Sequence, residues 1–342
     1  MKKWLFLSIT ILFISCKTST SNSPKTKSSA QSSPTDYVDI INATDLKKHL
    51  YTFASDEMQG RMTGEAGQKL AAEYIKDFYI KNNIASPMGG QNYYQPIPSS
   101  YFRSNSGIKD TENVIGYIEG SEFPEEVVVL TAHYDHVGVD KQGNIFNGAD
   151  DDGSGSVALL TIAKAFQKAK EDGNGPKRSV VILHVTAEEI GLLGSKYYSE
   201  NPIFPLKNTV VNLNIDMIGR IDPNKKDNPN YVYLIGSDKL SQELHDVSEK
   251  MNTTYGHLEL DYTFNDDNDP NRFYYRSDHY NFAKHNIPVI FYFSGVHEDY
   301  HQPTDTADKI EYDLLEKRAR LVFYTAWELA NRKNRIQLTI NK

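Results

Sequence analysis

The sequence contains a single cysteine, Cys16, among 342 residues. It therefore offers no intrachain disulfide and no cluster of thiolate metal ligands. It also lacks a run of lysine and arginine, and its net charge is −8. A broad nucleic-acid interface needs a basic face, so we expect no nucleic-acid partner. What is present is 39% hydrophobic and 11% aromatic content, enough for a packed core.

The N-terminus lacks an apolar run long enough for a transmembrane helix. Two lysines precede the apolar segment 4–14, which is shorter than the about 20 residues that span a bilayer. The segment ends at Phe13-Ile14-Ser15-Cys16, which resembles a bacterial lipobox, where a signal peptidase cuts before the cysteine and the cysteine is acylated. We expect residues 1–15 to be a lipoprotein signal peptide. The alternative is a plain secretory signal followed by an unrelated cysteine.

The segment after the signal peptide has almost nothing to bury. Residues 16–36 are rich in Ser, Thr, Lys and Pro, which predicts a flexible tether. Residues 37–335 contain no repeat and no low-complexity tract, and we expect them to form one compact domain. A lipidated Cys16 would anchor a monomeric protein in a bacterial cell envelope, facing the periplasm or associated with the outer membrane.

The folded part alternates between strand and helix patterns. The expected strands are 127–130, 180–185, 210–215, 231–235 and 288–293. The expected helices are 67–82, 154–169 (which Ser154 can cap), 240–251 and 314–332. This alternation predicts an α/β fold with a mixed, mostly parallel central sheet and helices on both faces. Ligands of such sheets bind beyond the carboxyl ends of the strands.

Acids and histidines follow these strands. His133, Asp135 and His136 come after the first, Glu188 and Glu189 after the second, Asp216 after the third, and the segment 297–301 after the last. An acidic cluster, 150–152, opens a helix. Imidazoles and carboxylates bind zinc, and one carboxylate can bridge two zinc ions. A nearby cation would also offset the repulsion between the adjacent acids.

Five motifs occur together in this order. They are His133-x-Asp135, Asp150-Asp151-Asp152-Gly153-Ser154-Gly155, Glu188-Glu189-x-Gly191-x-x-Gly194-Ser195, Asn214-x-Asp216-Met217 and Tyr300-His301-x-Pro303-x-Asp305-Thr306. With the segment 55–61, they resemble the di-zinc aminopeptidases of family twenty-eight in peptidase clan MH. The resemblance extends over residues 55–331.

The resemblance implies a role for each matching residue. Asp151 would bridge two zinc ions, with His133 and Asp216 at one and Glu189 and His301 at the other. Glu188 would be the general base for a water that the metal pair activates. Asp135 would orient His133, as a partner that sets the imidazole tautomer. Tyr300 would either stabilise the oxyanion or simply pack beside His301.

Some residues admit other interpretations. Residues 297–301 satisfy the one-zinc motif H-E-x-x-H, which works only on a helix. Pro303 disfavours a helix here, so we expect His301 to be the ligand and His297 to line the pocket or support it. Strand alternation directs the side chains of His133 and His136 differently, and we expect only His133 to bind metal.

Residues outside the motifs have simpler interpretations. We expect His184 to be a hydrogen-bonded core histidine, and His279 to lie near the pocket or serve as structural support. The acidic stretch 261–269 could bind calcium but lacks the EF-hand glycine and glutamate, which favours a solvated loop. Arg272 and Arg276 could reach a substrate carboxylate.

The resemblance thus implies zinc-dependent hydrolysis of peptide bonds, as an exopeptidase that removes N-terminal residues. Glutaminyl cyclases share the expected fold but use one zinc ion, so they are the main alternative. A carboxypeptidase or dipeptidase of the same family, and a relative without activity, are also open. The sequence does not indicate which N-terminal side chain is preferred.

Overall fold

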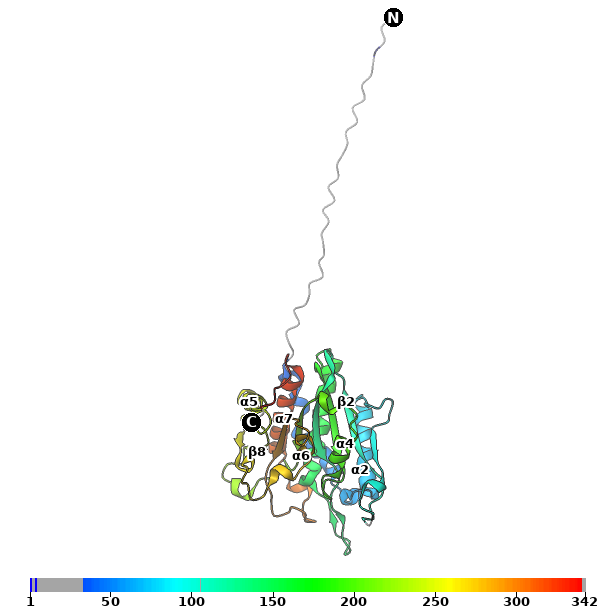
Figure 1. Ribbon diagram of the computed structural model, residues 1–342, viewed down its shortest axis with the longest axis vertical. Helices are drawn as coiled ribbons and strands as arrows, with labels where there is room; N and C mark the ends of the chain where they lie inside the picture. The colour runs from blue at the N-terminus through cyan, green and yellow to red at the C-terminus, as the bar shows by residue number, and fades with distance from the viewer. Residues whose placement is uncertain (2–3, 5–32, 105, 340–342) are drawn as a thin grey trace. The chain divides into compact units, whose positions relative to one another are not determined.

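The computed structural model describes residues 1, 4, 33–104 and 106–339 (Figure 1). The predicted signal-peptide cleavage site, the predicted lipidation site Cys16 and the expected tether up to residue 32 lie outside these residues. The last tether residues, Pro34–Asp36, form a 3-10 helix that Ser33 caps, so ordered structure begins before residue 37. In the described part of the chain, no helix is long and apolar enough to cross a membrane.

An eight-stranded sheet forms the centre of the domain. In spatial order its strands are β1 (Tyr94–Ile97), β2 (Thr111–Ile118), β6 (Arg178–Val185), β3 (Phe123–His133), β7 (Thr209–Ile215), β10 (Val289–Phe293), β8 (Tyr231–Ile235) and β9 (Glu259–Asp261). The four central strands, β6, β3, β7 and β10, are parallel. Strands β1, β2 and β8 pair antiparallel to their inner neighbours. The mixed, mostly parallel sheet is confirmed. Sequence patterns missed β1, β2 and β9.

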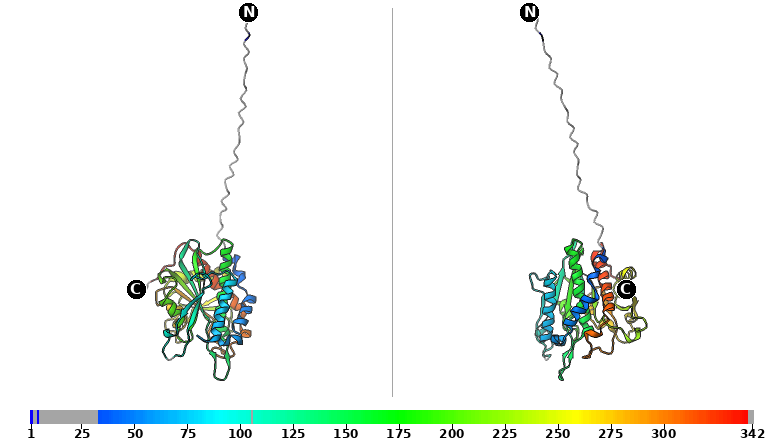
Figure 2. Two further views of the ribbon diagram at one scale, coloured as in Figure 1. Left: turned by 90° about the vertical axis from the view of Figure 1, so that its right-hand side faces the viewer. Right: turned by 180° about the vertical axis from the view of Figure 1, so that it is seen from behind.

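Helices cover both faces of the sheet (Figure 2). They are α1 (Ala43–Phe53), α2 (Ala66–Lys81), α3 (Gly155–Glu171), α4 (Leu193–Glu200), α5 (Gln242–Met251), α6 (His279–Ala283) and α7 (Tyr312–Asn331). Alternate residues of β3 divide between the two faces: Val128 and Leu130 pack with α1, α2, α3, α5 and α7. Val127 and Val129 pack with α4 and α6. All expected helices are present, and a small hairpin, β4 (Gly138–Val139) with β5 (Ile145–Phe146), projects from the domain.

The carboxyl ends of the central strands lie level at one edge of the sheet. His133 is in register with Val185, and Tyr292 with Ile215. This register places the segments that follow β3, β6, β7 and β10 side by side. They lie beyond the carboxyl ends of the strands, where ligands of such sheets bind. Another expectation was wrong: Ser154 does not cap α3. Its backbone is already helical, and its hydroxyl donates to the Asp150 carbonyl at 2.9 Å.

Candidate metal centre

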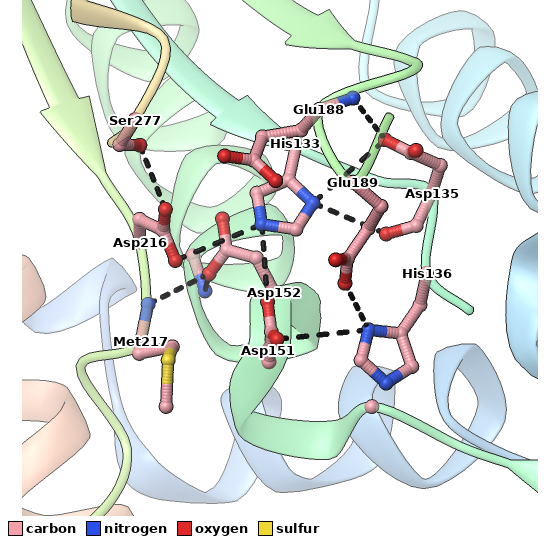
Figure 3. Close-up of polar contacts among 12 residues, drawn as sticks. His133, Asp135, His136, Asp151, Asp152, Glu188, Glu189, Asp216, Met217 and Ser277 are labelled. Carbon is pink, nitrogen blue, oxygen red and sulfur yellow. Dashed lines mark hydrogen bonds and ion pairs between the residues drawn. The ribbon is translucent and has the colours of Figure 1, made fainter. Parts of the chain in front are cut away.

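The predicted site residues meet at this edge of the sheet (Figure 3). His133 is the last residue of β3, and Asp216 directly follows β7. Glu188 and Glu189 follow β6 after a turn in which Ala187 has a positive φ of 58°. Asp151 lies in an irregular π-helical segment, Ala149–Ser154, whose Asp151–Asp152 peptide bond is cis.

His133, Asp151 and Asp216 form what we call the inner half-site. The Nε2 atom of His133 lies 3.1 Å from Asp151 Oδ1 and 3.6 Å from Asp216 Oδ1. All three residues are buried, and their ligand atoms lie within 4.8 Å of one another. This is an arrangement that one ion can share.

Asp151, Glu189 and His301 form the outer half-site. The Nε2 atom of His301 lies 3.0 Å from Asp151 Oδ2 and 3.0 Å from Glu189 Oε2. His301 lies in a turn with a φ of 54°, and 37% of its side chain is exposed. Because this segment is not helical, the H-E-x-x-H interpretation does not apply. Asp151 is therefore the one residue that belongs to both half-sites.

His136 also reaches the outer half-site, contrary to the expectation that its side chain points elsewhere. Its Nδ1 atom lies 2.7 Å from Glu189 Oε1 and 3.8 Å from Asp151 Oδ2 (Figure 3). The expectation extended strand alternation past His133, but β3 ends there. Beyond the strand end, the chain turns and the alternation rule loses its basis.

The electrostatics of the centre favour a cation. Although burial opposes ionisation, contacts with His133 and His301 hold the pKa of Asp151 well below its ordinary value. Burial also opposes protonation of His301, yet Asp151 and Glu189 raise the pKa of this imidazole to about 10. Asp151 Oδ2, Glu189 Oε1 and His301 Nε2 are buried and have no hydrogen-bond partner among the described residues. Buried carboxylate and imidazole atoms without a hydrogen-bond partner fit a metal ion.

Glu188 lies beside the inner half-site without taking part in either group. Burial raises the pKa of its carboxyl well above the ordinary value, and the negative charges of Asp216 and Asp278 raise this pKa further. A carboxylate with a raised pKa can accept and release a proton near neutral pH. The geometry separates Glu188 from the ligand Glu189, as predicted for a base and its neighbour.

Asp135 supports both His133 and Glu188. His133 Nδ1 lies 3.1 Å from the backbone oxygen of Asp135 and 3.7 Å from its carboxylate. Asp135 therefore contacts the ring as expected, with its main chain closer than its carboxylate. The carboxylate accepts from the backbone N–H of Glu188 at 3.2 Å and from the Thr63 hydroxyl at 2.8 Å. One residue thus fixes the orientation of the imidazole and the position of the base.

Two further networks hold the inner ligands. Ser277 donates to Asp216 Oδ2 at 2.7 Å and accepts from the Asn214 side chain at 2.8 Å. The sequence analysis named His279 here, but its Nε2 lies 2.9 Å from the carbonyl of Tyr274. The residue that supports a ligand is Ser277, and His279 has a structural role.

A second network lies behind Asp151, the residue that the two half-sites share. Asp305 accepts from the backbone N–H groups of Asp150 and Asp151 at 3.0 and 3.2 Å. His297 Nε2 lies 3.2 Å from Asp150 Oδ2, so this histidine contacts the carboxylate next to Asp151 and belongs to neither half-site. Of the alternatives left open for His297, the structure favours support behind the ligands.

A pocket opens directly beside the inner half-site. Its walls contain Asp151, Glu188, Asp216, Met217, Phe273, Arg276, Phe291, Phe293, Val296 and Tyr300. The ring of Tyr300 stacks on that of His301, with centroids 4.0 Å apart. Most of the wall is apolar or aromatic, and Arg276 is the cation on it. The site can therefore place a small or medium apolar group next to the carboxylates of Glu188 and Asp216.

The remaining candidates lie away from the centre. His184 is a buried core histidine, as predicted: its ring lies 2.9 Å from the Tyr79 hydroxyl and 3.0 Å from the Ser156 carbonyl. In the acidic stretch 261–269, Asp266 accepts from the backbone of Asn268. Among the residues that the structure describes, no member of this stretch belongs to a group that could hold a metal.

Comparisons with known proteins agree with this geometry. A family model described as peptidase family M28 matches residues 113–326. A probable leucine aminopeptidase of Arthroderma otae is 27% identical over 275 residues, which are 71% of this chain and 72% of that protein. BSAP, a zinc aminopeptidase from Bacillus subtilis, superposes with a TM-score of 0.65 at 17% identity, over 86% of this chain and 96% of that one.

A glutaminyl cyclase from Bacteroides thetaiotaomicron is equally similar in structure. Its TM-score is 0.65 at 17% identity, over 84% of this chain and 98% of that one. Both solved structures therefore show a shared fold, and the fold alone does not distinguish peptide hydrolysis from cyclisation. The distinction has to come from the site.

Proposed function

The chain belongs to peptidase family M28, and on this premise we propose that it removes N-terminal residues from peptides with the help of two zinc ions. The main support for the proposal is that two separate groups of possible ligand atoms share Asp151. Two groups of acids and histidines meet there, and Glu188 lies beside them on the wall of the adjacent pocket. A one-metal cyclase would not need the second group.

The ligand atoms divide between two ions. His133 and Asp216 would hold one ion, Glu189 and His301 the other, and Asp151 would bind both. When bound, the pair supplies Lewis acidity, which lowers the pKa of water and polarises the scissile carbonyl. The buried, unpaired oxygens of Asp151 and Glu189 fit this role.

Glu188 handles the proton. Its carboxylate accepts a proton from the attacking water and returns it to the leaving amine, which is the role of a general base that becomes an acid. The raised pKa of Glu188 suits both steps. Tyr300, on the pocket wall beside His301, would donate its hydroxyl proton in a hydrogen bond to the developing oxyanion.

The pocket supports a preference for an apolar N-terminal side chain. Phe273, Phe291 and Phe293 present rings, and Met217 and Val296 complete the apolar wall. An apolar side chain buried against these groups gains about 1.5–3 kcal/mol over an exposed one. We therefore expect peptides that begin with Leu, Met or Phe to be the better substrates.

A Glu188→Gln variant tests the catalytic assignment. Because the substitution removes the base and leaves every ligand in place, we expect zinc content to stay at the wild-type level while kcat falls by about 10²–10⁴-fold. Zinc is counted by mass spectrometry, and turnover is followed with leucine-p-nitroanilide. Turnover at the wild-type rate would exclude Glu188 as the base.

A peptide library, free and N-acetylated, tests the exopeptidase assignment. Only free peptides should lose residues from their N-terminus. Cleavage of the acetylated set would contradict an aminopeptidase, and release of C-terminal residues would indicate a carboxypeptidase. One zinc ion per chain together with cyclisation of N-terminal glutamine would replace the proposal by a glutaminyl cyclase.

We also propose that the enzyme is a monomeric lipoprotein of the bacterial cell envelope. The support is the apolar segment 4–14 that ends at Cys16, followed by a polar tether. A Cys16→Ser variant expressed in bacteria should leave the membrane fraction and fail to incorporate labelled palmitate. Wild-type protein that stays unlabelled would contradict the anchor, and size-exclusion chromatography tests the monomer.

A further inference from the structure

His136 lies at the outer half-site although it belongs to none of the motifs that mark the family. Its side chain is buried, and its Nδ1 atom faces Glu189 and Asp151. We propose that His136 is an additional ligand of the outer ion, through Nδ1. This inference rests on the proposed two-zinc site and extends it by one imidazole.

The contact between His136 and Glu189 does not have the geometry of a hydrogen bond. His136 Nδ1 lies 2.7 Å from Glu189 Oε1, yet neither atom has a hydrogen-bond partner among the described residues. The two atoms are thus close without being aligned on each other. Ligands of one ion have this relation, because each directs its lone pair at the metal.

Other atoms are directed at the same region. Glu189 Oε2 and Asp151 Oδ2 each lie 3.0 Å from His301 Nε2, and the rings of His136 and His301 meet edge to face with centroids 5.6 Å apart. The ligand atoms of His136, Asp151 and Glu189 lie within 4.8 Å of one another. The second ring nitrogen of His136 points away from the acids (Figure 3).

The protein holds the His136 ring in this direction. A Cβ atom at Gly148, whose φ is 55°, would lie 2.5 Å from the ring, so only glycine leaves room for it. The backbone N–H of His136 donates to the Arg61 carbonyl at 3.2 Å. The buried Arg61 guanidinium donates to the carbonyls of Tyr134 and Gly148, on the two segments that flank the ring. These contacts orient the ring before any metal binds.

The extra ligand makes the two half-sites unequal. The outer ion would have four protein ligands, the number found in closed structural zinc sites, whereas the inner ion would have three. Three protein ligands plus an open position are typical of a catalytic zinc ion. The open position next to Glu188 and the pocket therefore belongs to the inner half-site, and the outer half-site mainly retains its ion.

Zinc K-edge absorption spectroscopy and thermal melting test the inference on the full-length enzyme. In the wild type we expect three imidazoles, from His133, His136 and His301, shared by two zinc ions. In His136→Phe we expect two imidazoles, and zinc affinity at one of the two sites should fall by about tenfold or more. His136→Asn places an oxygen close to the position of Nδ1 and should restore part of this affinity.

Thermal melting with and without zinc distinguishes a metal ligand from a residue that only packs. Zinc raises Tm because it binds the folded state, and the rise grows with the affinity. His136→Phe should therefore reduce the zinc-dependent rise and leave the Tm of the metal-free protein unchanged or higher. The matched control is His184→Gln, at another buried histidine, which should alter the metal-free Tm and leave the zinc-dependent rise intact.

The outcomes distinguish the two proposals. Two zinc ions per chain with only two imidazoles in the wild type would overturn the role of His136 and leave the proposed function standing. A lower metal-free Tm with an unchanged zinc-dependent rise in His136→Phe would do the same. A wild-type protein that binds fewer than two zinc ions would overturn the two-zinc site itself.

Discussion

The inner and outer half-sites share Asp151 but are built in different ways. Inner ligands stand at strand ends: His133 closes β3 and Asp216 follows β7 directly. Outer ligands stand on loops, with His301 in a left-handed turn at φ 54° and partly exposed. The inner pair is therefore as rigid as the sheet, whereas the outer pair depends on turns held by other contacts.

Both half-sites include residues with a strained backbone. Three of the ten non-glycine residues with positive φ in the described part of the chain are Ala187, just before the two glutamates, Met217, just after Asp216, and His301. Such conformations persist only where the surroundings impose them, and they gather at functional sites. Here they direct side chains from different loops toward one point.

Asp151→Asn should have the largest effect because it damages both half-sites at once. The amide keeps the shape of the side chain but loses the charge that both ions share. We expect zinc content to fall below one ion per chain and kcat/KM to fall by about a thousandfold or more, since residues that act as a unit fail together. Retention of two zinc ions with strong activity would show that Asp151 does not bridge.

Asp216→Ala and Glu189→Ala should each remove one ion, from the inner and outer half-site respectively. Zinc content should fall to one per chain in both variants, and activity should fall less than in Asp151→Asn. The outer ion that remains in Asp216→Ala should exchange with added cobalt more slowly than the inner ion that remains in Glu189→Ala, because four protein residues would hold the outer ion and three the inner one. Equal exchange rates would show that the number of protein ligands does not distinguish the half-sites.

Asp278→Asn should change the pH dependence of activity through its effect on Glu188, beside the inner half-site. Burial raises the pKa of Asp278 to about 7, and its negative charge contributes to the raised pKa of Glu188. A neutral amide removes that contribution, so Glu188 stays ionised to lower pH. The acid limb of the kcat/KM profile should shift to lower pH by about half a unit to one unit. A shift to higher pH, or none, would contradict the coupling.

Arg276→Ala should have the smallest effect, at the pocket rim. Arg276 stacks over the Phe273 ring at 4.9 Å and lines the pocket. Its charge repels a basic N-terminal side chain, so the variant should cleave Lys- and Arg-peptides about three- to fivefold better relative to Leu-peptides, as expected for an exposed charge. Arg272→Ala, on a neighbouring pocket, is the matched control and should leave the ratio unchanged.

Much of the inner half-site could be predicted because its residues follow predicted strands. The buried runs that form β3 and β7 place His133 and Asp216 at one edge of the sheet. The separation of Glu188 from Glu189 was also predictable in kind, because neighbours after a strand point in different directions. The roles of Ser277 and Asp278 were not predictable. Ser277 acts through a hydrogen bond to Asp216 and Asp278 through its charge near Glu188, and no spacing in the sequence encodes either.

By itself, the sequence determined the α/β fold, the edge of the sheet that bears the chemistry and the set of metal-binding residue types. The physical reason is that hydrophobic periodicity specifies strands, and parallel strands bring their carboxyl ends together. Only the tertiary structure decided which way each loop side chain turns. His136 is the clearest case: three residues past the end of β3, contacts with Arg61 and Gly148 orient its ring toward the outer half-site.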